Sequence, residues 1–213
     1  MTLTRPVVLY QTEQSARTRR EILAVAVDIA SAEGLEGLSI GRLAAELKMS
    51  KTGIFAHFGS KQQLQLATIE AAKEIFFGQV VEPSLDSSRG IPRLSAMLNN
   101  WLGYLERIVF RGGCFFAAAS AEFDSRPGAV RDLIADLTKQ WLVAIREEIR
   151  FAQKQKRIRE SVDPAQLAFE LHAYVQEANW AFKLFDDQSA FTTARGAISE
   201  RIASVCLSRT PRK

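Results

Sequence analysis

The sequence has few of the residues on which catalytic and metal sites depend. Its 213 residues include two histidines, His57 and His172, and two cysteines, Cys114 and Cys206. The cysteines lie far apart without metal-type spacing, which argues against a disulfide framework and a zinc site. The sequence also lacks a phosphate-binding glycine loop and a nucleophile elbow, and its acidic residues are too scattered to nominate a catalytic pair. We therefore expect a protein that is not an enzyme and that needs no metal or cofactor.

Long hydrophobic runs are also missing. The longest uncharged apolar stretch of note, residues 114–121, is far shorter than the roughly 20 residues of a membrane helix. The N-terminus lacks the apolar segment of a secretory signal, so we expect a cytoplasmic protein with no membrane partner. The net charge of +4 suits a nucleic-acid partner but does not require one.

Apolar residues recur three and four positions apart almost throughout, and alternating apolar and polar runs are rare. This periodicity predicts an all-α protein of about nine helices. Glycines, prolines and capping side chains set the expected helix limits, which are about 15–33, 40–47, 51–58, 60–78, 94–110, 115–123, 127–155, 164–185 and 191–207. A loop rich in Ser, Gly and Pro at 83–92 is the clearest break between an N-terminal and a C-terminal region.

The second and third helices are short and joined by a tight turn, as in a helix-turn-helix that presents one helix to the major groove of DNA. Ile54 and Phe58 are expected to face a small core, which leaves Lys51, Thr52 and His57 outward together with Ala56. Small or hydrogen-bonding side chains of this kind suit a base-reading surface. Ser39, Arg42, Lys61 and the amides at the helix starts are expected to hold phosphates. The alternative is an ordinary trio of core helices with a solvated polar face.

The run from residue 35 to 64, with GLSIGRLAAELKMSKTGIFAHFGSKQQL at its centre, resembles the DNA-binding domain of TetR-type repressors. The similarity covers about residues 17–75. Its matching features are the hydroxyl of Ser39, the apolar Leu43, Ala44 and Leu47, the turn at 50–53, and His57, Phe58, Ser60 and Lys61. The chain departs from the family at Phe55, where a tyrosine whose hydroxyl reaches a phosphate is most common. The expected DNA-binding residues are Ser39, Arg42, Ser50, Lys51, Thr52, Gly53, Phe55, His57 and Lys61.

The resemblance implies a DNA-binding domain at residues 1–60 and a helical ligand-binding and dimerisation domain at 61–213. It also implies a homodimer whose recognition helices lie about 34 to 36 Å apart, one helical turn of DNA. The last two long helices usually form the dimer interface in such proteins, which here nominates Leu167, Leu171, Val175, Ala178, Phe182, Ile198, Ile202 and Val205. The implied function is repression of a palindromic operator, released by a small-molecule effector. The competing hypothesis is a helical small-molecule-binding or adaptor protein without sequence-specific DNA binding.

Large aromatic side chains are frequent after the loop at 83–92. They nominate a ligand pocket made of Trp101, Tyr104, Phe115, Phe116, Trp141, Tyr174 and Trp180. The alternative for each is a place in the packed core or the dimer interface, since helical aromatic residues usually belong to cores. Cys114 suggests a redox sensor, although a buried and inert thiol is the more common case.

Overall fold

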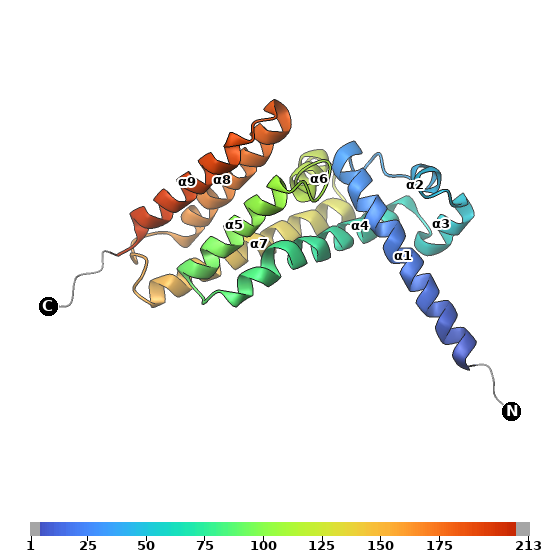
Figure 1. The fold of residues 1–213 in the computed structure, drawn as a ribbon, viewed down its shortest axis with the longest axis horizontal. Coiled ribbons are helices and arrows are strands. Elements are labelled where there is room, and N and C mark those ends of the chain that lie inside the picture. The colour runs from blue at the N-terminus through green and yellow to red at the C-terminus, as the bar shows by residue number, and fades with distance from the viewer. Residues whose placement is uncertain (1–4, 208–213) are drawn as a thin grey trace. The chain divides into compact units, whose positions relative to one another are not determined.

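The structure is a computed structural model that describes residues 5–207, with side chains from Glu13 onward (Figure 1). Within these residues the chain forms nine α-helices and no strand, which confirms the predicted all-α class. They are α1 (Arg5–Glu33), α2 (Ile40–Leu47), α3 (Lys51–Phe58), α4 (Lys61–Phe76), α5 (Ile91–Glu106), α6 (Phe115–Phe123), α7 (Ala129–Lys154), α8 (Pro164–Phe185) and α9 (Ser189–Val205). None of the described helices has the length and apolar character needed to cross a lipid bilayer.

Three of the predicted helices have wrong limits, and one of them, expected at 94–110, spans Ile91–Glu106. The first helix begins at Arg5 rather than near Ser15, and its second residue is Pro6, at a position where a helix tolerates proline because the missing N–H has no partner there. The predicted loop at 83–92 is shorter, because α4 continues as a π-helix (Phe77–Val81) and a 3-10 helix (Glu82–Asp86). Pro83 again lies in a first turn, so proline marks the start of a helix in both places.

The chain forms two compact units. The first, unit 1, comprises the chain up to Ala72 together with Phe110–Leu133, and the second, unit 2, comprises Lys73–Val109 and the chain from Ile134 onward. The helices α4 and α7 contribute residues to both units. The sequence prediction divided the chain once, between residues 60 and 61, whereas the compact units divide it at three places.

Unit 1 contains the predicted helix-turn-helix. The Ser39 hydroxyl accepts a hydrogen bond from the Arg42 backbone N–H at 3.1 Å, and the Ser50 hydroxyl accepts one from the Gly53 N–H at 3.0 Å, so both predicted caps are confirmed. Between the two helices Lys48 adopts a left-handed conformation with φ 54°. The α1 helix packs against α2 and α6, and α2 packs against α3. Their shared core includes Ile22, Leu23, Ala26, Ile29, Leu43, Ile54 and Phe58.

Unit 2 is built around α5, α8 and α9. The Asp163 carboxylate caps α8 by accepting a hydrogen bond from the Ala165 N–H at 2.8 Å. Along their length α8 and α9 lie side by side (Figure 1), and both also contact α5. This packing buries an apolar face of each helix. Other residues of α8 and α9 remain exposed and form a second face on each helix.

Candidate nucleic-acid interface

The α3 helix exposes a polar face above a buried apolar one. Ile54 and Phe58 are buried, whereas Lys51, Thr52, Phe55 and Ala56 are exposed. Because the Ser50 hydroxyl satisfies the Gly53 N–H, the helix begins sharply at Lys51. Lys51 forms no ion pair with any described residue, so its ammonium group is free for an external anion.

His57 lies at the edge of this face rather than fully in solvent. Its ring is half-buried, with its centroid 6.2 Å from that of Phe58. The side chain lines a depression of about 400 Å³ in unit 1, together with Arg19, Phe58, Gln63, Leu66, Ala67, Glu70 and Leu133. The Arg19 guanidinium lies 5.1 Å from the centre of the Phe58 ring, a cation–π contact that holds the α1 side of this depression.

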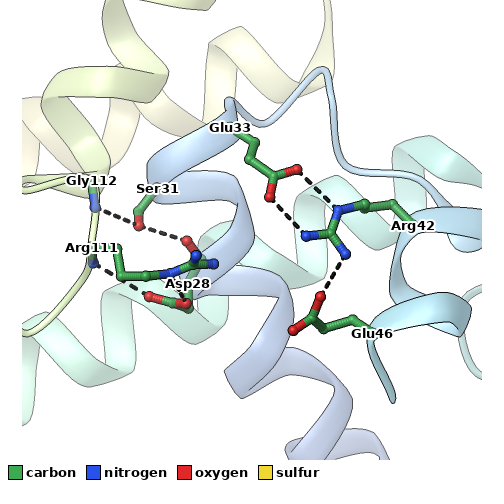
Figure 2. Close-up of polar contacts among 7 residues, drawn as sticks. All are labelled: Asp28, Ser31, Glu33, Arg42, Glu46, Arg111 and Gly112. Carbon is green, nitrogen blue, oxygen red and sulfur yellow. Dashed lines mark hydrogen bonds and ion pairs between the residues drawn. The ribbon is translucent and has the colours of Figure 1, made fainter. Parts of the chain in front are cut away.

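Arg42, expected to hold a phosphate, is bound to two carboxylates (Figure 2). Its Nε and Nη2 atoms donate to the two Glu33 oxygens at 3.0 and 2.8 Å, and its Nη1 donates to Glu46 at 2.6 Å. These hydrogen bonds raise the pKa of Arg42, and the bond from Arg42 lowers the pKa of Glu33. A phosphate contact by Arg42 therefore requires that a carboxylate give way.

Lys61 is likewise paired. Its ammonium group donates to Glu36 at 2.7 Å, and this hydrogen bond lowers the pKa of Glu36. Gln65 reaches the same segment, with its Nε2 donating to the Leu35 carbonyl at 3.0 Å. Lys61 is therefore tied to the segment between α1 and α2, and its approach to DNA competes with Glu36.

Helix α6 and the loop before it hold the end of α1 and the start of the helix-turn-helix. The Glu122 carboxylate accepts hydrogen bonds from the backbone N–H groups of Leu35 and Glu36 at 2.7 and 3.0 Å. The Gly112 N–H donates to the Ser31 hydroxyl at 3.2 Å (Figure 2). A Cβ at Gly112 would lie 1.6 Å from the Ser31 carbonyl oxygen, so only glycine fits there.

Sequence reasoning missed these residues. Glu122 is one of the acidic residues too scattered to nominate as a catalytic pair, and Gly112 and Gly113 are among the glycines that set the expected helix limits. The loop also forms an ion pair between Arg111 and Asp28, which Figure 2 shows beside the Ser31 contact. The glycine pair was the only signal in the sequence, since a close approach of two backbone segments leaves no other trace in a single chain.

The aromatic residues nominated for a ligand pocket do not form one cluster. Trp101, Tyr104 and Trp141 surround Phe76 in unit 2, with ring centroids 6.1, 5.7 and 5.1 Å from it. Tyr174 is half-buried in the same unit. The remaining three lie elsewhere: Phe115 and Phe116 in unit 1, and Trp180 on the surface against Phe185. Cys114, the nominated sensor, is buried.

The residues nominated for a dimer interface are buried within a single chain. All eight, from Leu167 to Val205, are at most 7% exposed, because they fill the space between α8, α9 and α5. They leave no surface for a second chain. Another apolar set on α8 is exposed instead: Phe169 at 68%, Trp180 at 51% and Leu184 at 60%.

Comparisons with known proteins add independent information. A family model for bacterial regulatory proteins of the tetR family matches residues 22–68, and a model of the tetracyclin repressor-like C-terminal domain matches residues 90–198. No curated protein matches the chain.

Several solved structures are similar to the chain over most of its length. One is a TetR transcriptional regulator from Chloroflexus aurantiacus J-10-fl, 24% identical with a TM-score of 0.82, covering 92% of this chain and all 100% of that one. AibR in complex with isovaleryl coenzyme A and operator DNA is 24% identical with a TM-score of 0.68, covering 88% and 97%. A transcriptional regulator from Saccharomonospora viridis in complex with choline is 22% identical with a TM-score of 0.74, covering 91% and 100%. At these identities the similarity shows the fold.

Proposed function

The chain belongs to the TetR family of bacterial regulatory proteins, and on this premise we propose that it represses transcription from a palindromic operator until a small-molecule effector releases it. A member of this family is a DNA-binding transcriptional regulator. The exposed face of α3 carries the finer proposal, because it combines a lysine that has no ion pair among the described residues with a threonine hydroxyl, on a helix held from behind by Ile54 and Phe58.

In this proposal α3 enters the major groove. Thr52 contacts base edges, and Lys51 and the first amides of α3 contact phosphates. The amides at the start of α2 are the second phosphate contact. The Ser39 and Ser50 hydroxyls have a structural role, since each accepts a hydrogen bond from its own helix.

Dimerisation in this proposal uses the exposed face of α8 together with that of α9. Phe169, Trp180 and Leu184 share one face of α8 at helical spacing, and large exposed apolar side chains on one helix face mark a candidate interaction surface. Small residues occupy exposed positions of α9 at matching spacing: Thr192, Gly196, Ser199 and Ala203. Large side chains on one helix and small ones on the other let the helices of two chains approach closely.

The effector is proposed to bind in unit 2. AibR and the Saccharomonospora viridis regulator have each been solved with a small molecule bound, isovaleryl coenzyme A and choline respectively. An effector that prefers one conformation shifts the population toward it by its differential affinity. The helices α4 and α7 contribute to both units and are the candidate elements for transmitting that preference.

A fluorescence anisotropy titration tests the DNA-binding part. The protein is titrated against duplex DNA flanking its own gene and against shuffled DNA of the same composition, at two salt concentrations. We expect tight binding to one palindromic segment and at least a thousandfold weaker binding to the shuffled duplex. Weak, salt-sensitive binding without sequence preference would instead indicate a helical binding or adaptor protein.

A further inference from the structure

Three buried side-chain atoms in unit 2 lack a hydrogen-bond partner among the described residues. They are the indole nitrogens of Trp101 and Trp141 and the amide oxygen of Gln176. Trp101 as a whole is only 2% exposed. Two of the atoms are donors and the third is an acceptor.

Trp101 and Trp141 belong to one group of contacting rings with Phe76 and His172, to which we assign Gln176 by its position on α8; these five residues are here called the indole cluster. The ring centroids of Trp101 and Trp141 lie 5.5 Å apart, and that of His172 lies 5.2 Å from Trp101. Phe76 closes the group 5.1 Å from Trp141. Gln176 lies one helical turn after His172 and one turn before the exposed Trp180, and because its amide oxygen is buried we assign that oxygen to the His172 side of α8.

Leaving these groups unpaired is costly. A buried donor or acceptor without a partner costs about 1–3 kcal/mol, and native proteins contain few such atoms. The neighbouring ring faces are only weak acceptors, so they do not replace a carbonyl oxygen. Two unpaired donors and one unpaired acceptor in one apolar cluster are the complement of a molecule that has oxygen acceptors and one N–H or O–H donor.

The cluster has no charged group to receive a charged ligand. Burial lowers the pKa of His172, so its imidazole is neutral at neutral pH. A cation would be attracted to the ring faces but would leave both indole N–H donors without an acceptor. An anion would find no fixed positive charge among these five residues.

We propose that the indole cluster binds a neutral, planar small molecule whose carbonyl or ether oxygen accepts hydrogen bonds from Trp101 and Trp141, and whose hydroxyl or amide N–H donates to Gln176. This inference rests on the proposed function, in which such a molecule is the effector.

Isothermal titration calorimetry on the full chain without DNA tests the binding. The probe is 4-hydroxyacetophenone, which carries both a carbonyl and a hydroxyl group. Its comparators are 4-ethylphenol without the carbonyl, acetophenone without the hydroxyl, the anion 4-hydroxybenzoate, and choline. We expect saturable binding of 4-hydroxyacetophenone and about fivefold to tenfold weaker binding of acetophenone and 4-ethylphenol. The two charged compounds are expected to bind more weakly still.

Variants locate the site. Trp101→Phe, Trp141→Phe and Gln176→Leu should each weaken binding of 4-hydroxyacetophenone by about fivefold to tenfold. The matched control is Gln140→Leu, because Gln140 precedes Trp141 on α7 but is exposed, and it should bind like the parent chain. Gln176→Leu keeps the test decisive where a tryptophan variant fails to fold.

Four results would overturn the inference: no saturable binding of 4-hydroxyacetophenone, equal binding of 4-ethylphenol, tightest binding of choline, or cluster variants that match Gln140→Leu. Melting temperatures add a readout for structural water. If buried water molecules accept the hydrogen bonds of the two indole N–H groups, Trp101→Phe and Trp141→Phe remove these bonds and lower the melting temperature. In that case 4-hydroxyacetophenone shows no saturable binding. Because calorimetry uses no DNA, probe binding together with failed operator binding would remove only the regulator proposal.

Discussion

Arg42 engages Glu33 and Glu46 at the same time, and this places two carboxylates beside the helix-turn-helix. Such exposed ion pairs contribute little to stability, about 0–1 kcal/mol each. The two carboxylates matter more for phosphate binding than for stability. Each of them repels an approaching phosphate and also holds the Arg42 guanidinium that would otherwise attract it. Lys51 on α3 has no such competitor among the described residues, so we expect it to contribute more to phosphate binding than Arg42.

Thr52 tests base reading at the level of one side chain. Thr52→Ala should weaken operator binding by about tenfold and reduce the preference over shuffled DNA, because a hydroxyl that contacts a base carries sequence information. Lys51→Ala should weaken binding to both duplexes by the same factor, and it should lower the salt dependence of binding by the equivalent of about one phosphate contact. Anisotropy titrations measure both.

The control is Ser88→Ala, an exposed hydroxyl in unit 2, which should bind DNA like the parent chain. Melting temperatures must stay within the range of the control for the comparison to hold. A Thr52→Ala variant that binds the operator normally would remove Thr52 from the interface.

His172 gives unit 2 a pH-dependent stability. Burial lowers its pKa below the usual 6.5, so the unfolded chain takes up a proton at a pH where the folded chain does not. This contribution to the free energy of unfolding is complete above about pH 6.5 and decreases as the pH falls from there toward the folded pKa. Urea unfolding from about pH 7 to about pH 5 should show a smaller decrease for His172→Gln than for the parent chain. Identical decreases would contradict this prediction.

Among the elements, α6 belongs with the helix-turn-helix rather than with its neighbours in sequence. Glu122 supplies the acceptor for two backbone N–H groups at the start of the segment between α1 and α2. The N–H of the buried Leu35 is withdrawn from water and needs such a partner, and no described backbone carbonyl accepts from it or from the N–H of the exposed Glu36. The conformation of the connection that leads into α2 therefore depends on a carboxylate 86 or 87 residues further along the chain.

Removing this carboxylate should destabilise unit 1. We expect Glu122→Ala to lower the free energy of unfolding by about 1–3 kcal/mol, because the N–H groups of Leu35 and Glu36 lose their acceptor. Glu122→Gln keeps one acceptor oxygen and should lie between Ala and the parent chain. Glu160→Ala, at an exposed position, is the matched control, and urea unfolding is the measurement. A loss for Glu122→Ala no larger than that of the control would show that water replaces the carboxylate.

For the whole molecule, the exposed apolar face of α8 decides how two chains combine. We predict that Trp180→Lys, or Trp180→Lys with Leu184→Lys, converts the proposed dimer to a monomer, because it buries charge in an apolar contact. A monomer presents one recognition helix and engages one half-site at a time. Operator binding should therefore weaken by about a hundredfold or more. Sedimentation velocity measures the first effect and anisotropy the second.

Gln140→Lys adds the same charge to an exposed site on α7 and should remain dimeric. If the double α8 variant remains a dimer with unchanged operator affinity, the interface lies elsewhere. Helical content by circular dichroism must stay unchanged in all three variants, because the side chains concerned are exposed and contribute little to the core of unit 2.

The helices, their caps and the outward face of α3 could be read from the sequence, because each depends on residues within a few positions. Ser39 and Ser50 cap the helices that they precede, and Ile54 and Phe58 turn inward with their helical period. The helix starts that failed, at Arg5, near Pro83 and at Ile91, are places where a proline lies in the first turn of a helix rather than ending one.

The all-α class, the helix-turn-helix and the family could thus be inferred from the sequence alone. Only the tertiary structure decided which side chains are free: it paired Arg42 and Lys61 with glutamates, buried the eight apolar residues between α8 and α9, and brought Glu122 to the backbone of Leu35. The physical reason is that periodicity shows that a face is apolar or charged. It carries no information on which distant segment covers that face.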